Sequence, residues 1–185
     1  NFIDQSWIQE PIRLIPRMKE MIQSIMPGMK LAITEYNFGN GDGISAGLAQ
    51  AEALAIFGRE GVDLATRFGV VKAGTPIEDA FKLYLDYDGQ GSDIKGDSVS
   101  TKSAIPDALG AYTIAGTDGK TYVLLFNKDS AVREVNVSGE FGEAQAAVYR
   151  FSSSKRLTAA GTTDIEADGF SLRMPARSAA LVVIP

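Results

Sequence analysis

The chain of 185 residues contains no cysteine and no histidine. The absence of cysteine excludes a disulfide framework and any thiol chemistry. The absence of histidine removes both the commonest general base and the commonest metal ligand of proteins. Any proton transfer carried out by this chain must therefore use carboxylates, tyrosine, lysine or water.

Basic clusters and long apolar runs are missing as well. The 18 Lys and Arg residues are outnumbered by 23 Asp and Glu, and they never gather into a basic face, so nucleic acid is not expected as a partner. No run approaches the roughly 20 apolar residues of a membrane span. With 45% hydrophobic residues, we expect a soluble chain that buries one sizeable core or two modest ones.

The first half of the chain alternates between helix and strand patterns. The pattern predicts the order helix, strand, helix, strand, helix, over 8–25, 29–34, 45–57, 62–71 and the stretch after Pro76. The signals are apolar residues spaced three and four apart, the turn at Pro27-Gly28, and Ser45 as an N-cap. The second helix is rich in Ala and Gly, which suits close approach to a sheet. Such alternation is typical of parallel α/β architecture, in which ligands gather at the carboxyl ends of the strands.

The second half has only short alternating runs separated by turns. Two Asp-Gly sequences, "TDGK" at 117–120 and "ADGF" at 167–170, predict hairpins. The predicted strands are 110–115, 120–126, 133–137, 144–151, 170–174 and 179–184, which together favour an antiparallel β-sandwich. With residues 86–98 as the connecting stretch, we expect two domains, 1–90 and 91–185.

The strand in "KLAITEYNFG", residues 30–39, ends on an acid, a phenol and an amide. Glu35, Tyr36 and Asn37 follow Thr34, where the strand should reach the surface. Spacing alone favours an ordinary exposed acid at the start of a loop for Glu35, because carboxylates are mostly surface residues.

A series of motifs in a fixed order changes that interpretation. "PIRLIPRMKEMI", "KLAITEYNFG", "ISAGLAQAEALAIFGREGV" with "LATRF", and "AFKLYLDYDGQGSDIKGDSVS" resemble the C-terminal part of the catalytic domain of glycoside hydrolase family 44. The resemblance is dense from residue 7 to about 103 and looser over the later strands. It implies the C-terminal part of a (β/α)8 TIM-like barrel followed by an antiparallel β-sandwich, and a retaining endo-β-1,4-glucanase activity.

The resemblance also implies roles for individual residues. The Glu of the family's "TEYN" motif is the catalytic nucleophile, which here is Glu35. Tyr36 and Asn37 are candidates for orienting it or for contacting a sugar hydroxyl, with loop packing as the alternative. Phe68 stands where the family usually has a tryptophan on which sugar stacks, but its smaller ring favours core packing, as we also expect for Trp7.

The acid/base partner of the nucleophile is missing from this sequence. The family has it in an Asn-Glu pair on an earlier strand, and no Asn-Glu dipeptide occurs here. A retaining glycosidase needs both carboxylates. We therefore expect this chain to need an N-terminal complementary chain of the same enzyme, either as the bound partner of a nicked protein or as the missing part of a truncated one.

The stretch "DYDGQGSDIKGD" has part of a calcium-loop spacing. Asp86, Asp88 and Asp97 stand at loop positions one, three and twelve, but position twelve is not Glu and no exit helix is expected. A glycine-rich loop joining the two domains is the better interpretation, so we expect no metal.

The sequence thus predicts a secreted bacterial enzyme that hydrolyses soluble β-1,4-glucan and uses no cofactor, because two carboxylates suffice. Two alternatives stay open. One is a non-catalytic carbohydrate-binding or interaction module, which a row of exposed aromatic residues would indicate. The other is a barrel glycosidase of another family, with xylan, xyloglucan or mannan as its preferred substrate.

Overall fold

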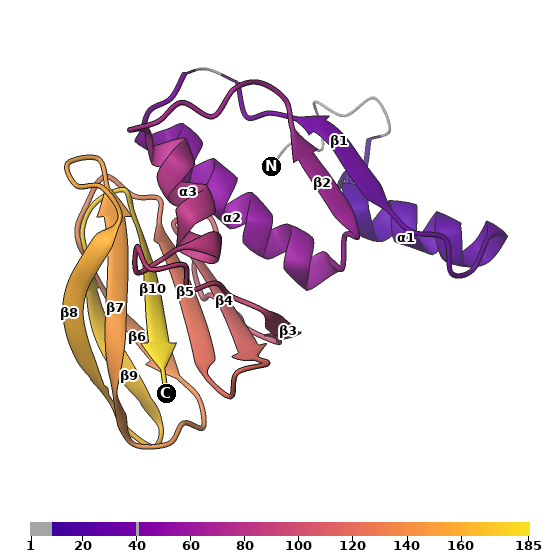
Figure 1. Cartoon of the computed structure of the whole chain (residues 1–185). Helices are drawn as coiled ribbons and strands as arrows, with labels where there is room; N and C mark the ends of the chain where they lie inside the picture. Colours follow the sequence, from indigo (N-terminus) through magenta and orange to yellow (C-terminus); the bar gives the residue numbers. More distant parts are fainter. Residues whose placement is uncertain (1–8, 40) are drawn as a thin grey trace. The chain divides into compact units, whose positions relative to one another are not determined.

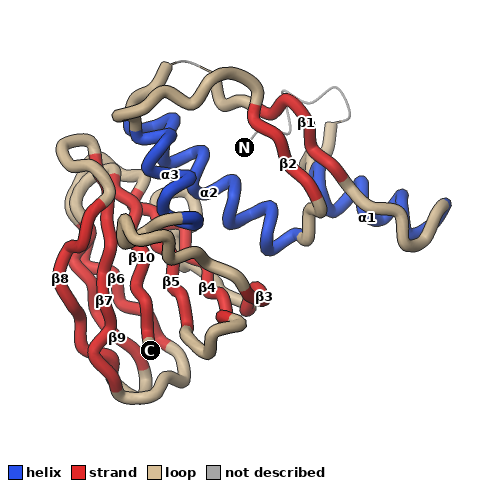
Figure 2. Tube along the Cα trace, viewed as in Figure 1, coloured by secondary structure: helices blue, strands red, loops and turns tan. Residues whose placement is uncertain are grey.

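The computed structural model describes residues 9–39 and 41–185, so the predictions that concern Trp7 and Ile8 lie outside the described residues (Figure 1). Three helices and the first two strands alternate, and strands alone follow (Figure 2). The elements are α1 (Leu14–Ile25), β1 (Ala32–Tyr36), α2 (Ile44–Glu60), β2 (Leu64–Arg67), α3 (Pro76–Leu85), β3 (Gly96–Val99), β4 (Leu109–Gly116), β5 (Thr121–Asn127), β6 (Arg133–Ser138), β7 (Ala144–Ser152), β8 (Thr158–Ile165), β9 (Gly169–Met174) and β10 (Ser178–Ile184).

The chain forms two compact units. The first contains residues up to Asn37 together with 56–69, and the second contains 38–55 and 70–185. Helix α2 contributes residues to both, so this division differs from the boundary expected at residue 90. The expected boundary at residue 90 stays a prediction.

The first unit is built on a parallel pair of strands. Strands β1 and β2 run side by side, with Ala32 opposite Leu64 and Ile33 opposite Ala65. Helix α1 begins at Leu14, not at residue 8 as predicted. Pro16 explains the late start, because proline lacks an N–H and is tolerated in a helix only within the first turn.

Strand β1 lies later in the sequence than predicted. It begins at Ala32 and ends at Tyr36, so Glu35 is inside the strand rather than after it. Strand β2 is shorter than the predicted 62–71 and ends at Arg67. Asp63 accounts for its start, because the Asp63 carboxylate accepts a hydrogen bond from the Leu31 amide at 2.8 Å, just before the two strands pair.

Helices α2 and α3 meet in the second unit. Ser45 lies within α2, which begins at Ile44, so its prediction as an N-cap was wrong. Thr75 caps α3, and its hydroxyl accepts from the Glu78 amide. A Cβ added to Gly47 would lie 2.5 Å from that of Pro76, so this small residue of α2 serves the approach to α3 rather than to a sheet.

The rest of the second unit is a sandwich of two unequal antiparallel sheets. One has six strands in the order β3-β4-β5-β10-β7-β8, and the other consists of β6 and β9 (Figure 1). Their facing sides enclose the main core: Val123, Leu125, Val135, Ala146, Val148, Ile165, Phe170, Leu172, Met174, Ala180, Val182 and Ile184. The antiparallel sandwich predicted from the sequence is therefore confirmed.

One of the two predicted hairpins is confirmed. "TDGK" joins β4 and β5, which pair along their whole length. "ADGF" does not join a pair, because β8 pairs with β7 while β9 pairs with β6, and only a single bridge links Glu166 and Gly169. Strand β8 was missed because most of its residues are exposed, so its sequence shows no alternation of apolar and polar positions.

Among residues 9–39 and 41–185, no helix is both long enough and apolar enough to cross a membrane.

Candidate functional site

The carboxyl ends of β1 and β2 bring together the four residues that the sequence singled out. Because the strands are parallel, Glu35, Tyr36 and Asn37 at the end of β1 lie beside Phe68, which follows β2. The amide of Phe68 donates to the Tyr36 carbonyl at 3.0 Å and extends the pairing beyond the last residue of β2. In parallel sheets this edge is where ligands bind.

Glu35 has an unusual backbone for a strand residue. Its φ is +60°, in the left-handed region that non-glycine residues rarely adopt. The register of the two strands shifts at the same place: Ile33 faces Ala65, yet Tyr36 faces Arg67, so β1 carries an extra residue across this interval. Such a bulge re-aims a side chain, and bulges are over-represented next to active sites. The Glu35 side chain is exposed.

The residues around Glu35 make mostly structural contacts. The Tyr36 ring packs edge-on against Phe57, with the ring centroids 5.1 Å apart. The Asn37 amide nitrogen donates to the Phe68 carbonyl at 2.9 Å. The Phe68 side chain is 61% exposed, so the prediction that it packs in a core is wrong for the described chain, while its role towards sugar stays a prediction.

Sequence reasoning missed Arg67. Its guanidinium donates to the carbonyls of Phe68 at 3.2 Å and of Gly69 at 3.3 Å, so it holds the same turn that Asn37 holds from the other strand. The motif "LATRF" did contain this residue, but nothing in its spacing indicates that the side chain folds back onto its own backbone.

The acidic loop between α3 and β3 uses its carboxylates to hold itself. Asp88 accepts from the Ser92 hydroxyl at 2.6 Å and from the Gln90 amide at 2.9 Å, and the Ser92 bond is the main reason why the pKa of Asp88 is lowered. Asp86 accepts from the Gly91 amide at 2.6 Å, whereas Asp97 lies in β3. Over the described ranges 9–39 and 41–185, no group of three or more Asp, Glu, His or Cys side chains could hold a metal ion.

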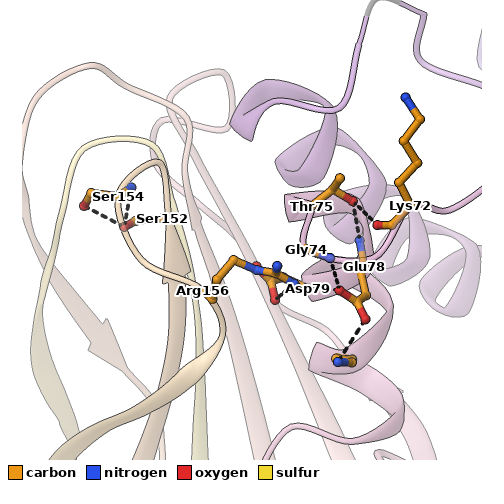
Figure 3. A network of polar contacts seen from close by, with 9 residues as sticks. Lys72, Gly74, Thr75, Glu78, Asp79, Ser152, Ser154 and Arg156 are labelled. Carbon is orange, nitrogen blue, oxygen red and sulfur yellow. Dashed lines mark hydrogen bonds and ion pairs between the residues drawn. The ribbon is translucent and has the colours of Figure 1, made fainter.

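A second polar network joins the β7–β8 connection to the first turn of α3 (Figure 3). Arg156 donates to both carboxylate oxygens of Asp79, at 2.6 and 2.9 Å, and to Glu78 at 2.8 Å. Glu78 also accepts from the Gly74 amide at 2.7 Å. The Arg156 bond is the largest of the contributions that lower the pKa of Glu78 to about 2.

No family model matches the chain. Among curated proteins it is 32% identical over 176 residues to a beta-mannanase/endoglucanase A of Caldicellulosiruptor saccharolyticus, which covers 91% of this chain and 13% of that protein. The solved structure of CelM2, a bifunctional glucanase-xylanase protein from a metagenome library, is 36% identical with a TM-score of 0.90. That match covers 100% of this chain and 36% of CelM2.

A family 44 endoglucanase produced by Clostridium acetobutylium gives a similar match. It is 32% identical with a TM-score of 0.87, over 97% of this chain and 37% of that structure. The chain thus spans about a third of the length of the solved structures that it matches, and less of the curated relative. Its sequence and fold are similar to one part of a solved glycoside hydrolase family 44 structure.

The resemblance to glycoside hydrolase family 44 that the sequence predicted is confirmed by these matches. The combination of alternating helices and parallel strands with an antiparallel sandwich is confirmed as well.

Proposed function

We propose that this chain is the part of a retaining endo-β-1,4-glucanase that carries the catalytic nucleophile, Glu35. The observation that supports this most strongly is the position of Glu35 in a bulge at the carboxyl edge of two parallel strands. The similarity to enzymes named as endoglucanases supports the same class of reaction.

The chemistry follows from what a retaining glycosidase requires. A carboxylate attacks the anomeric carbon and forms a glycosyl ester while an acid protonates the departing glycosidic oxygen. Water, deprotonated by the same acid/base, then releases the sugar with its original anomeric configuration, and both carboxyl groups regain their starting states. Glu35 is exposed, and among residues 9–39 and 41–185 no lysine or arginine forms an ion pair with it, which leaves its carboxylate available to a substrate.

The acid/base residue is assigned to polypeptide outside this chain. Two features support a complementing segment. Parallel sheets normally have both faces covered and several strands side by side, yet in the part of the chain that the structure describes β1 and β2 pair as a sheet of two strands. Helix α1 and its flanks also expose a run of apolar side chains, namely Ile12, Leu14, Met18, Met21, Ile25 and Met26.

The substrate is a β-1,4-linked glucan, with xyloglucan, xylan or mannan as alternatives. The names of the relatives include glucanase, xylanase and mannanase. We assign the site of action to the outside of the cell, because polymers of this size are degraded there.

Replacement of Glu35 in the complete enzyme tests the nucleophile. Glu35→Gln should lower kcat on a soluble β-glucan by at least about 10³-fold, because no other group can form the covalent intermediate. The matched control is Glu143→Gln, the same change at an exposed acid of the sandwich, which should keep full turnover. Proton NMR of the first product should show the β-anomer. Unchanged turnover in Glu35→Gln would end the assignment, and an initial α-anomer would end the retaining mechanism.

Intact mass spectrometry of the purified protein tests the complementing segment. A co-purifying polypeptide of roughly twice this mass is expected if the enzyme is nicked, since a closed barrel needs about 250 residues. Added back to the isolated chain, that polypeptide should restore β-glucan hydrolysis. Hydrolysis by the isolated chain alone would contradict the proposal.

A further inference from the structure

Glu35 occupies a backbone conformation that has to be held in place. A non-glycine residue with φ near +60° is strained relative to one with an extended backbone, and this conformation persists only where the surroundings fix it. Strand pairing alone does not supply this, because the register shifts between Ile33 and Tyr36 and leaves the intervening residues outside the regular ladder. Contacts on the far side of the bulge must therefore hold it.

Those contacts come from both strands and meet at the backbone of Phe68. The Phe68 amide donates to the Tyr36 carbonyl at 3.0 Å, and the Phe68 carbonyl accepts from the Asn37 side chain at 2.9 Å. Arg67 donates to the same carbonyl at 3.2 Å. The residues immediately after Glu35 are thereby tied to the end of β2 twice, once through backbone and once through the Asn37 side chain.

We infer that Asn37 is a positioning residue for Glu35 rather than a sugar-binding residue, an inference that rests on the proposed function. Its side-chain amide joins the carboxyl ends of β1 and β2 by a hydrogen bond, and this link keeps the bulge from relaxing into regular strand pairing. Relaxation by one residue would turn the Glu35 side chain to the opposite face of the sheet, because side chains alternate along a strand. Asn37 thus acts on the aim of the nucleophile and not on the affinity for substrate.

The kinetic test uses Asn37→Ala and Asn37→Gln in the complete enzyme, with Asn136→Ala as the matched control. Asn136 is an exposed asparagine of β6 whose side chain accepts from the Ser171 hydroxyl at 2.7 Å. Asn136→Ala therefore also removes one side-chain hydrogen bond, but in the sandwich. Asn37→Ala should lower kcat about 10-fold to 100-fold with KM changed less than twofold, because misplacement by about 1 Å costs roughly this much. Asn37→Gln keeps the amide donor and should recover part of kcat, and Asn136→Ala should behave like the parent.

A structural readout separates this inference from the nucleophile assignment. The Phe68 amide should exchange its hydrogen at least about tenfold faster in Asn37→Ala, since it loses the closure that protects its bond to Tyr36. Faster exchange in Asn37→Ala, together with loss of activity in Glu35→Gln, supports both proposals. Unchanged exchange, or a rise in KM at constant kcat, overturns the positioning role even if Glu35 is the nucleophile. Active Glu35→Gln with faster exchange in Asn37→Ala overturns the catalytic role alone, and thermal unfolding of each variant identifies any that fails to fold.

Discussion

Asp79 and Arg156 form a two-bonded ion pair in which the acid is almost entirely buried. The Arg156 nitrogens lie 2.6 and 2.9 Å from the two carboxylate oxygens, and the Asp79 side chain is 3% exposed against 44% for Arg156. The residues are 77 positions apart in the sequence, so the pair ties α3 to the connection between β7 and β8. The two parallel N–H to oxygen bonds fix the orientation as well as the distance of the two side chains.

Removal of Arg156 should therefore destabilise the second unit by more than a surface ion pair would. Arg156→Ala leaves the carboxylate of Asp79 buried without its partner, and we expect a loss of about 2 kcal/mol in the free energy of unfolding. Urea unfolding measures it. The matched control is Arg173→Ala, which removes an exposed arginine 3.5 Å from Glu134 and should change stability by less than about 0.5 kcal/mol. Equal losses in the two variants would show that burial of Asp79 has no effect.

The pKa of Glu78 predicts how this region responds to acid. Hydrogen bonds from Arg156, from the Gly74 amide and from Lys82 lower it from the ordinary 4.5 to about 2. The ionised form is therefore favoured by folding, so its contribution to stability is complete above pH 4.5 and is lost as the pH falls towards 2. Carbon NMR of the Glu78 carboxyl should show a midpoint near the lower value, and Arg156→Ala should raise that midpoint. A midpoint of 4.5 in the parent would contradict the network.

Two glycines of α2 separate the effect of space from the effect of helix propensity. A Cβ on Gly47 would lie 2.6 Å from the Pro76 carbonyl oxygen, whereas nothing lies within 4 Å of one on Gly58. Gly47→Ala should therefore destabilise by about 1–3 kcal/mol despite the better propensity of alanine. Gly58→Ala should stabilise by up to about 1 kcal/mol. Stabilisation by both changes in thermal unfolding would show that α2 and α3 do not pack as closely as the structure places them.

The order of the elements could be predicted from the sequence, because hydrophobic periodicity and Gly or Pro turns determine it locally. The ends of the elements and the pairing of strands within the sheets could not be predicted. The start of α1 depends on Pro16, but the apolar stripe extends further towards the N-terminus and predicts an earlier start. The turn at Asp168-Gly169 resembles a hairpin, although its flanking strands join different sheets. Pairing across sheets is a property of the folded chain that no short window of sequence carries.

The candidate site shows the same division. The motif around Glu35 could be identified from the order of the sequence motifs, and the parallel strands bring its members to one edge. The left-handed backbone of Glu35 could not be predicted, because the bulge depends on the register between two strands 32 positions apart. The reach of Arg67 back to the Phe68 carbonyl is local, but no spacing in the sequence indicates it.

Phe68 offers a test of substrate contact that does not depend on the chemical step. Its ring is 61% exposed at the edge that carries Glu35, where a sugar ring could cover it. If it does, Phe68→Ala in the complete enzyme should raise KM about fivefold to tenfold on a soluble β-glucan at nearly constant kcat, the effect of losing roughly 1–1.5 kcal/mol of apolar contact. Phe68→Trp should lower KM, because a larger ring buries more area.

Leu85→Ala provides the matched control for these two variants. Leu85 is 63% exposed in α3, an element that contributes no residue to the candidate site, so the change removes a similarly exposed apolar side chain and KM should stay at the parent value. The order of KM from Ala through Phe to Trp at residue 68 is the decisive observation, since only a ring in contact with substrate produces it. The same KM in all three proteins would remove Phe68 from the binding site and leave its exposed ring to be covered by polypeptide instead.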